Sequence, residues 1–87
     1  MEKGLTFKFS KHALEQMELR GISKEIVKKI LLNPIQVRTE EGKKVYQSVI
    51  DDGRSLIRIF VNYKKDPQVI ITVYKTSKIK KYYEGKI

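Results

Sequence analysis

The chain has 87 residues, of which 40% are hydrophobic and 33% charged, and 19 Lys and Arg against 10 Asp and Glu give a formal net charge of +9. This length leaves room for one hydrophobic core, and the balance of apolar and charged residues excludes wholesale disorder. Because the chain contains no Cys, disulfides, a thiolate nucleophile and sulfur metal ligands are excluded, whereas the excess positive charge favours polyanions as partners.

Two helices are predicted in the N-terminal part of the chain. Ser10 is a typical N-cap, residues 11–20 form the helix that follows, and Gly21 is a typical helix stop. Ser23 then caps a second helix over residues 24–32, where apolar residues recur at intervals of three and four until an Asn-Pro pair ends the pattern. The two helices should form a hairpin.

Beyond this hairpin the apolar period changes to two, which predicts β-strands. Short turn-rich segments separate the strands, so consecutive antiparallel hairpins are favoured over parallel crossovers, which need about a dozen residues or more. The sequence therefore predicts a single α+β domain over residues 1–87, with two N-terminal helices packed on a four-stranded antiparallel meander sheet. The helical hairpin should span residues 9–33, the sheet 35–75, and a basic tail or short helix 76–87, with strands over 35–39, 44–50, 55–63 and 68–75.

Alternation along the last two strands divides the sheet into an apolar and a mixed face. The apolar face, which should receive the helices, would carry Ile57, Ile59, Val61, Val69, Ile71 and Val73. The other face would present Arg58, Ile70, Thr72 and Tyr74, among others. Arg58 has no obvious carboxylate partner in the sequence, so it is a candidate for binding phosphate by paired hydrogen bonds.

Lysines interleaved with tyrosines near the C-terminus suit a single-stranded nucleic acid, because ammonium groups replace counterions on phosphates and phenol rings stack on bases. Fifteen of the 19 cations are Lys, which suits the phosphate backbone better than bidentate reading of base edges. The alternative is a solvated tail that only keeps the protein soluble. Candidate RNA-binding residues are Lys75, Lys78, Lys80, Lys81 and Tyr82, with Tyr46 and Arg54 at the periphery.

His12, the only imidazole, lies in the first turn of the first helix, where the helix dipole favours its neutral form. A neutral imidazole would accept the 2′-hydroxyl proton in RNA cleavage, while Arg58 stabilised the phosphate and Thr72 or Tyr74 oriented it or donated a proton. A lone His is more often structural, β-branched and aromatic residues populate any strand, and Arg20 suits the last turn of a helix without any function. One His with scattered carboxylates offers no metal-binding spacing.

Several short motifs together resemble a family of small prokaryotic proteins without assigned function that is grouped with the RelE-like toxins and the barnase-like ribonuclease superfamily. The resemblance is carried by Ser10-Lys11-His12-Ala13, Met17, Arg20-Gly21-Ile22, Asn33-Pro34 and Ile71-Thr72-Val73-Tyr74, in this order. It covers most of the chain, from Phe9 to about Tyr74. The helical motifs are moderately specific, and the Thr-Val-Tyr strand gains weight only from its position.

The resemblance implies a RelE-like fold of two helices and four strands, and RNA cleavage without metal or cofactor. His12, Arg20, Thr72 and Tyr74 fall on the matching positions, and Tyr82 or Tyr83 would resemble the C-terminal tyrosine of RelE-like toxins. The chain departs from the pattern at Gln16, where relatives often carry Arg, so the charge would come from Arg58 or the tail instead.

These observations give a leading hypothesis and two alternatives. The first is an endoribonuclease, the toxin of a toxin–antitoxin pair, which cleaves messenger RNA and is restrained by a cognate antitoxin; ribosome-bound messenger RNA is one candidate substrate. The second is a non-catalytic RNA-binding module in which His12 is structural, and the third is a subunit whose positive surface binds an acidic protein. With no apolar leader or membrane-spanning run in the sequence, the cytoplasm is expected. One geometric difficulty is that His12 and Arg58 should lie on different sides of the sheet.

Overall fold

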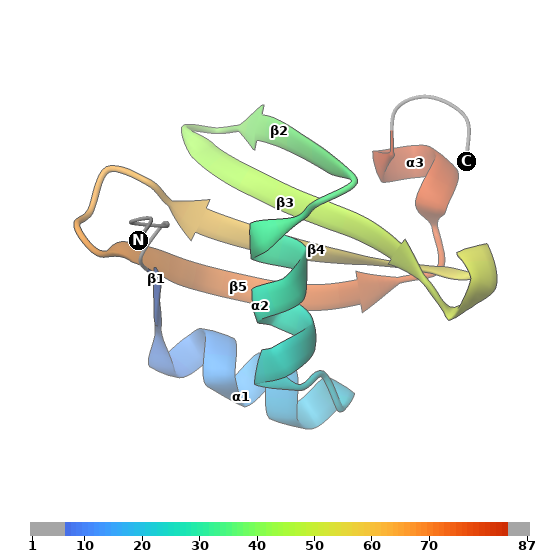
Figure 1. Cartoon of the computed structure of the whole chain (residues 1–87), viewed down its shortest axis with the longest axis horizontal. Helices are drawn as coiled ribbons and strands as arrows, with labels where there is room; N and C mark the ends of the chain where they lie inside the picture. Colours follow the sequence, from blue (N-terminus) through green and yellow to red (C-terminus); the bar gives the residue numbers. More distant parts are fainter. Residues whose placement is uncertain (1–6, 84–87) are drawn as a thin grey trace.

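The computed structural model describes residues 7–83, which form a single mixed sheet with helices on its two faces (Figure 1). The chain runs through β1 and the helices α1 and α2 before it enters four further strands and a last helical turn. The elements are β1 (Phe7–Phe9), α1 (Lys11–Arg20), α2 (Lys24–Leu32), β2 (Gln36–Glu40), β3 (Lys43–Ile50), the 3-10 turn η1 (Asp51–Gly53), β4 (Ser55–Asn62), β5 (Gln68–Thr76) and α3 (Ile79–Tyr82).

The bounds of the first two helices confirm the prediction, because the capping residues act as expected. Ser10 Oγ accepts a hydrogen bond from Ala13 N at 3.0 Å at the start of α1. Gly21 ends α1 in the left-handed conformation with φ 66°, which residues with a side chain adopt at a cost. At the start of α2, Ser23 Oγ accepts from Ile26 N at 3.1 Å.

The predicted four-stranded antiparallel meander is wrong, because β1 adds a fifth strand and pairs in parallel with β5. The strand order is β1-β5-β4-β3-β2, so the sheet is mixed, and a third helix follows it. β1 has only three residues, which is too short for an alternating pattern to identify. Its partner lies about sixty residues later in the chain, and Phe7 and Phe9 hold it by packing on the core.

The faces of β5 also differ from the prediction along half of the strand. The register shifts between Phe60 and Val61 of β4, so Thr72 pairs with Phe60 but Ile70 pairs with Val61. An irregularity of one residue reverses the side-chain alternation beyond it. Ile70 is therefore fully buried in the helix-covered core, where alternation predicted Ile71 and Val69.

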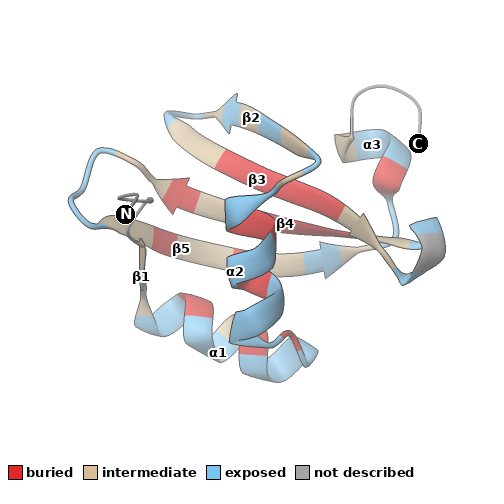
Figure 2. Cartoon of the chain, in the orientation of Figure 1, coloured by how far each residue is buried: buried red, intermediate tan, exposed pale blue. Residues whose placement is uncertain are grey.

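The main core lies between the sheet and the helices α1 and α2, whose outward turns are exposed (Figure 2). It contains apolar residues from both helices and from every strand except β2: Ala13, Met17, Ile22, Val27, Ile30, Leu31, Tyr46, Ile57, Ile59, Val61, Ile70 and Val73, with Phe7, Phe9 and Ile50 packed against them. Within residues 7–83, no helix is long and apolar enough to cross a membrane.

Candidate nucleic-acid interface

Arg58 of β4 is the centre of a polar network on the face of the sheet opposite α1 and α2. Its side chain is only 2% exposed. Its Nε donates to Gln47 Oε1 at 2.8 Å, its Nη1 to Tyr74 Oη at 2.8 Å and its Nη2 to Glu40 Oε2 at 2.5 Å. A buried cation is tolerated only when it is paired and hydrogen-bonded, and this guanidinium meets both conditions.

The strand register explains how these residues meet. Arg58 lies directly opposite Gln47 of β3 on one side and Tyr74 of β5 on the other. Gln47 in turn lies opposite Gln36 of β2 and donates to its Oε1 at 2.6 Å. A row of polar side chains therefore crosses four strands, and Glu40 completes it from β2. Arg58, which the sequence left without a carboxylate, has one in Glu40.

Three aromatic rings surround the same guanidinium. Its central carbon lies 4.4 Å from the ring centroid of Tyr82, 5.2 Å from that of Phe60 and 5.9 Å from that of Tyr74. The rings of Phe60 and Tyr74 are stacked with centroids 6.0 Å apart. These distances are typical of cation–π contacts, so Arg58 is held by charge, hydrogen bonds and aromatic faces together.

The backbone of α3 also joins the network. The Tyr82 carbonyl oxygen accepts from Arg38 Nη1 at 2.6 Å and from Gln47 Nε2 at 3.1 Å. Arg38 is paired as well with Glu40, with 3.8 Å between Nε and Oε2. Two side-chain donors from neighbouring strands therefore converge on one oxygen, directly beside the ring that covers Arg58.

All five predicted RNA-binding cations lie at or just beyond one end of the sheet, where β4 begins and β5 ends. Figure 1 shows η1 and α3 at this end, and Leu56 of β4 pairs there with Thr76 of β5. The side chains of these cations are exposed, and Lys75 forms an ion pair in which its Nζ lies 3.9 Å from Asp51 Oδ2. We call this group of five residues the basic end: Arg54, Lys75, Lys78, Lys80 and Lys81.

Tyr46, predicted at the periphery of the interface, lies on the other face of the sheet. It is 5% exposed within the main core, and its ring meets that of Phe7 edge to face at a centroid distance of 6.1 Å. Burial raises the pKa of the Tyr46 phenol above its ordinary value of 10.0, because the charged form would lose its hydration. This tyrosine is part of the packing between β1 and β3.

The predicted catalytic residues fall into two groups. Arg58 and Tyr74 are in direct contact, and Thr72 lies two residues before Tyr74 on the same face of β5. His12 and Arg20 are exposed residues of α1, which packs on the opposite face of the sheet. Arg20 Nε donates to Gln16 Oε1 at 3.3 Å, the side chain at which the sequence departs from the resemblance. The structure therefore brings three of the five together.

Comparison with known protein families gives one match. Residues 9–75 match a Domain of unknown function (DUF4258). The chain belongs to this family. No curated protein and no solved structure matches the chain. The match supports the resemblance to a family of unassigned function and does not extend to the RelE-like grouping.

The DUF4258 segment covers both helices and nearly all of the sheet, but it ends before α3. It therefore includes Arg58, Gln47, Glu40 and Tyr74, whereas Tyr82 lies outside it. Of these, sequence reasoning missed Gln47 and Glu40, together with Arg38 and Gln36. One signal was present: Gln47 interrupts the apolar alternation of Val45 and Val49 in β3, and a buried amide needs a polar partner.

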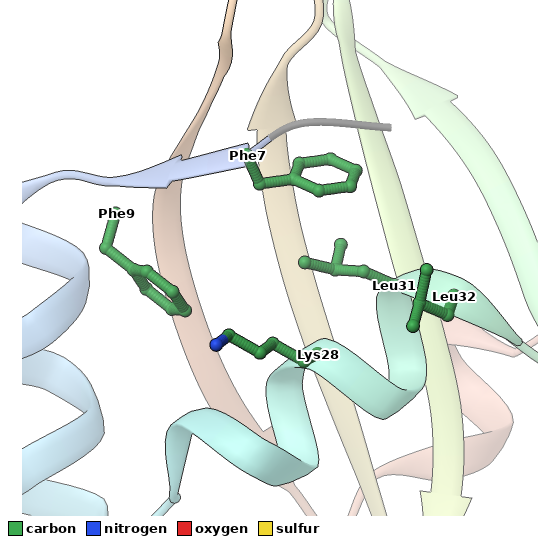
Figure 3. A pocket seen from close by; sticks show the side chains of 5 residues that line it. All are labelled: Phe7, Phe9, Lys28, Leu31 and Leu32. Atoms are coloured by element: carbon green, nitrogen blue, oxygen red, sulfur yellow. The ribbon is translucent and has the colours of Figure 1, made fainter. Parts of the chain in front are cut away.

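A concave region lies between β1 and α2, away from the Arg58 network (Figure 3). It is a hollow of about 200 Å³ lined by Phe7, Phe9, Lys28, Leu31 and Leu32. Its walls are apolar except for the Lys28 ammonium, so it offers no group of residues for acid–base chemistry. Within residues 7–83, His, Asp and Glu side chains form no group of three that could hold a metal ion.

Proposed function

We propose that this protein binds single-stranded RNA through the basic end and the adjoining Arg58 network. The observation that carries the proposal is the gathering of Arg54 and the lysines of the α3 region beside an aromatic, guanidinium-containing face. Phosphates would contact the exposed ammonium groups, and bases would stack on Tyr74 and Tyr82. The formal net charge of +9 would draw the polyanion to the protein from a distance.

Fluorescence anisotropy with a labelled single-stranded RNA, measured over a series of salt concentrations, tests this proposal. A Lys80→Gln/Lys81→Gln variant should bind more weakly at every salt concentration. The slope of log affinity against log salt should fall by about 0.7 for each phosphate that the variant no longer neutralises. Both side chains are exposed, so the fold should not change.

The matched control is Lys28→Gln/Lys29→Gln, which removes two adjacent exposed lysines from α2 on the other side of the sheet. The control should keep most of the wild-type affinity and slope. Equal losses in both variants would show that charge alone attracts the RNA, without a site at the basic end. Absence of measurable binding by the wild type at low salt would refute the proposal altogether.

A second candidate function is endoribonuclease activity of the kind that RelE-like toxins have, with a cognate antitoxin as the restraining partner. The hydrogen bond from Arg58 Nη1 to Tyr74 Oη favours it, because a phenol oxygen that accepts this bond directs its own proton elsewhere. Tyr74 would then donate that proton to the 5′-oxygen that leaves when a 2′-hydroxyl attacks the phosphate and loses its own proton to solvent. Arg58 would stabilise the negative charge that develops there.

Inducible expression in a bacterial host separates the two candidates. If the protein cleaves RNA, its expression should arrest growth and produce discrete new 5′ ends in total RNA, and Tyr74→Phe should relieve both effects. A His12→Ala variant beside it tests whether an imidazole on α1 takes part as the base. Intact RNA with soluble, folded wild-type protein would reject cleavage and leave RNA binding as the function.

A further inference from the structure

Tyr82 makes the two kinds of contact that a bound nucleotide would make on this face of the sheet. Its ring centroid lies 4.4 Å from the central carbon of the Arg58 guanidinium, a group on which unstacked RNA bases also pack. Its carbonyl oxygen takes hydrogen bonds from Arg38 Nη1 and Gln47 Nε2, as a phosphate oxygen would. One residue of the chain thus provides both a flat ring and a hydrogen-bond acceptor.

We propose that Tyr82 occupies the site of one nucleotide of a single-stranded RNA, and that α3 is a plug which must leave this site before the nucleotide enters. The inference rests on the proposed function, since it specifies where that RNA binds and what regulates it. Once α3 has left, Arg38 and Gln47 would hold a phosphate oxygen, and the uncovered guanidinium of Arg58 would carry a base.

The Arg58 guanidinium is arranged for such an exchange. Its hydrogen bonds to Gln47, Tyr74 and Glu40 run along the edges of the planar group and hold it in place. The ring of Tyr82 contacts the guanidinium, with its centroid 4.4 Å from the central carbon, and uses none of these bonds. A base could therefore replace the ring while all three edge contacts persist.

α3 is a single short helical turn with little buried surface. It has four residues, of which only Ile79 is buried, and Lys78 at its N-cap makes no side-chain capping bond. A helix this short has little stability of its own. Lys80 and Lys81 are exposed, so after α3 leaves the sheet they would still contact phosphates on either side of the site.

Weakening the plug should strengthen RNA binding, because the observed affinity is reduced by the fraction of molecules in which the site is closed. Ile79→Ala removes most of the buried side chain of α3 and leaves every proposed RNA contact in place. We expect its affinity for a short single-stranded RNA to rise on the order of tenfold. The control, Ile30→Ala on α2, removes a comparably buried side chain and should leave the affinity of the folded protein unchanged.

The outcomes separate the plug from the proposed function. If the wild type binds RNA and Ile79→Ala binds it more tightly, the result supports both the proposed function and the plug. Wild-type binding with an equal or weaker Ile79→Ala complex overturns the plug alone, since α3 would then be an ordinary part of the surface. Circular dichroism checks that both variants are folded at the assay temperature.

A second measurement does not depend on any substitution. In wild-type protein labelled with ¹⁵N, the side-chain amide of Gln47 and the backbone amides of residues 79–83 should shift together on addition of the RNA. Shifts of the α3 amides without any change at Gln47 would mean that RNA contacts α3 while it stays docked, which contradicts the plug.

Discussion

The two faces of the sheet are built from the same strands but differ in what holds them. On β4, Ile57 and Ile59 point into the core under α1 and α2, while Arg58 between them points into a network of hydrogen bonds and rings. The first face is covered by two helices of nine and ten residues, the second by a helix of four. The second face therefore has the smaller helical cover, and we expect α3 to detach at lower cost than α1 or α2.

The largest expected effect tests the helix-covered face. Ile59 is fully buried in the main core, and Ile59→Ala should lower the free energy of unfolding by about 3 kcal/mol, because it removes buried apolar surface and leaves a cavity. Urea unfolding followed by circular dichroism measures it. RNA affinity per folded molecule should not change. A loss of affinity that matches the loss of stability would mean that the faces are not independent.

Arg58→Met should have the next largest effect, on the opposite face. The substitution keeps most of the volume but leaves the Oε1 atom of the fully buried Gln47 without its donor and removes one of the two cations that pair with Glu40 among residues 7–83. We expect a loss of about 2 kcal/mol, below the usual cost for a buried pair because the Glu40 side chain is 30% exposed. Unlike Ile59→Ala, this variant should also lose RNA affinity. Unchanged affinity would remove Arg58 from the interface.

Ser10→Ala tests the junction between the helical layer and the sheet, with a smaller effect. Ser10 caps α1, and its hydroxyl also reaches the Ile71 carbonyl of β5 at 3.3 Å. Loss of the cap should cost about 1 kcal/mol. Ser23→Ala, which removes the cap of α2 alone, is the matched control and should cost less. Equal losses in thermal unfolding would show that the contact to β5 adds nothing.

The smallest effect is a pH dependence on the helix-covered face. Because burial raises the pKa of Tyr46 above 10.0, the folded chain holds the phenolic proton more tightly than the unfolded chain. The resulting contribution to the free energy of unfolding is complete below pH 10 and is lost as the pH rises through the pKa of Tyr46 in the folded chain. In an ultraviolet titration Tyr46→Phe should remove a phenol that ionises above pH 10.0. Loss of a phenol that ionises at its ordinary value would contradict the burial of this ring.

The helices could be predicted to the residue because their signals are local. Ser10, Gly21 and Ser23 each fix a helix end through bonds to residues at most four positions away. The pairing of the strands could not be predicted in the same way, because it depends on residues that are far apart in the sequence. The parallel pairing of β1 depends on residues 68–70, and the irregularity opposite Phe60 depends on how two strands meet.

The candidate site was predicted only in part, because local alternation locates residues on a face but does not show which distant residues they contact. Alternation alone placed Arg58 and Tyr74 on one face, and their contact at 2.8 Å confirms that placement. Glu40 was missed because it reaches Arg58 diagonally across β3. Tyr82 was predicted as an RNA-binding residue, but its contact with Arg58 was not, because a four-residue helix leaves no periodic pattern. The catalytic role predicted for His12 stays a prediction. His12 is an exposed residue of α1, which packs on the face of the sheet opposite Arg58.

Chemical-shift mapping of the wild-type protein with a short single-stranded RNA tests whether RNA binds the Arg58 face of the sheet. We expect the perturbed backbone amides to lie at the start of β4, the end of β5 and α3, together with the side-chain amide of Gln47. Perturbations confined to α1, α2 and the hollow beside Phe7 would contradict it, because the RNA would then bind the helical layer instead of the Arg58 face.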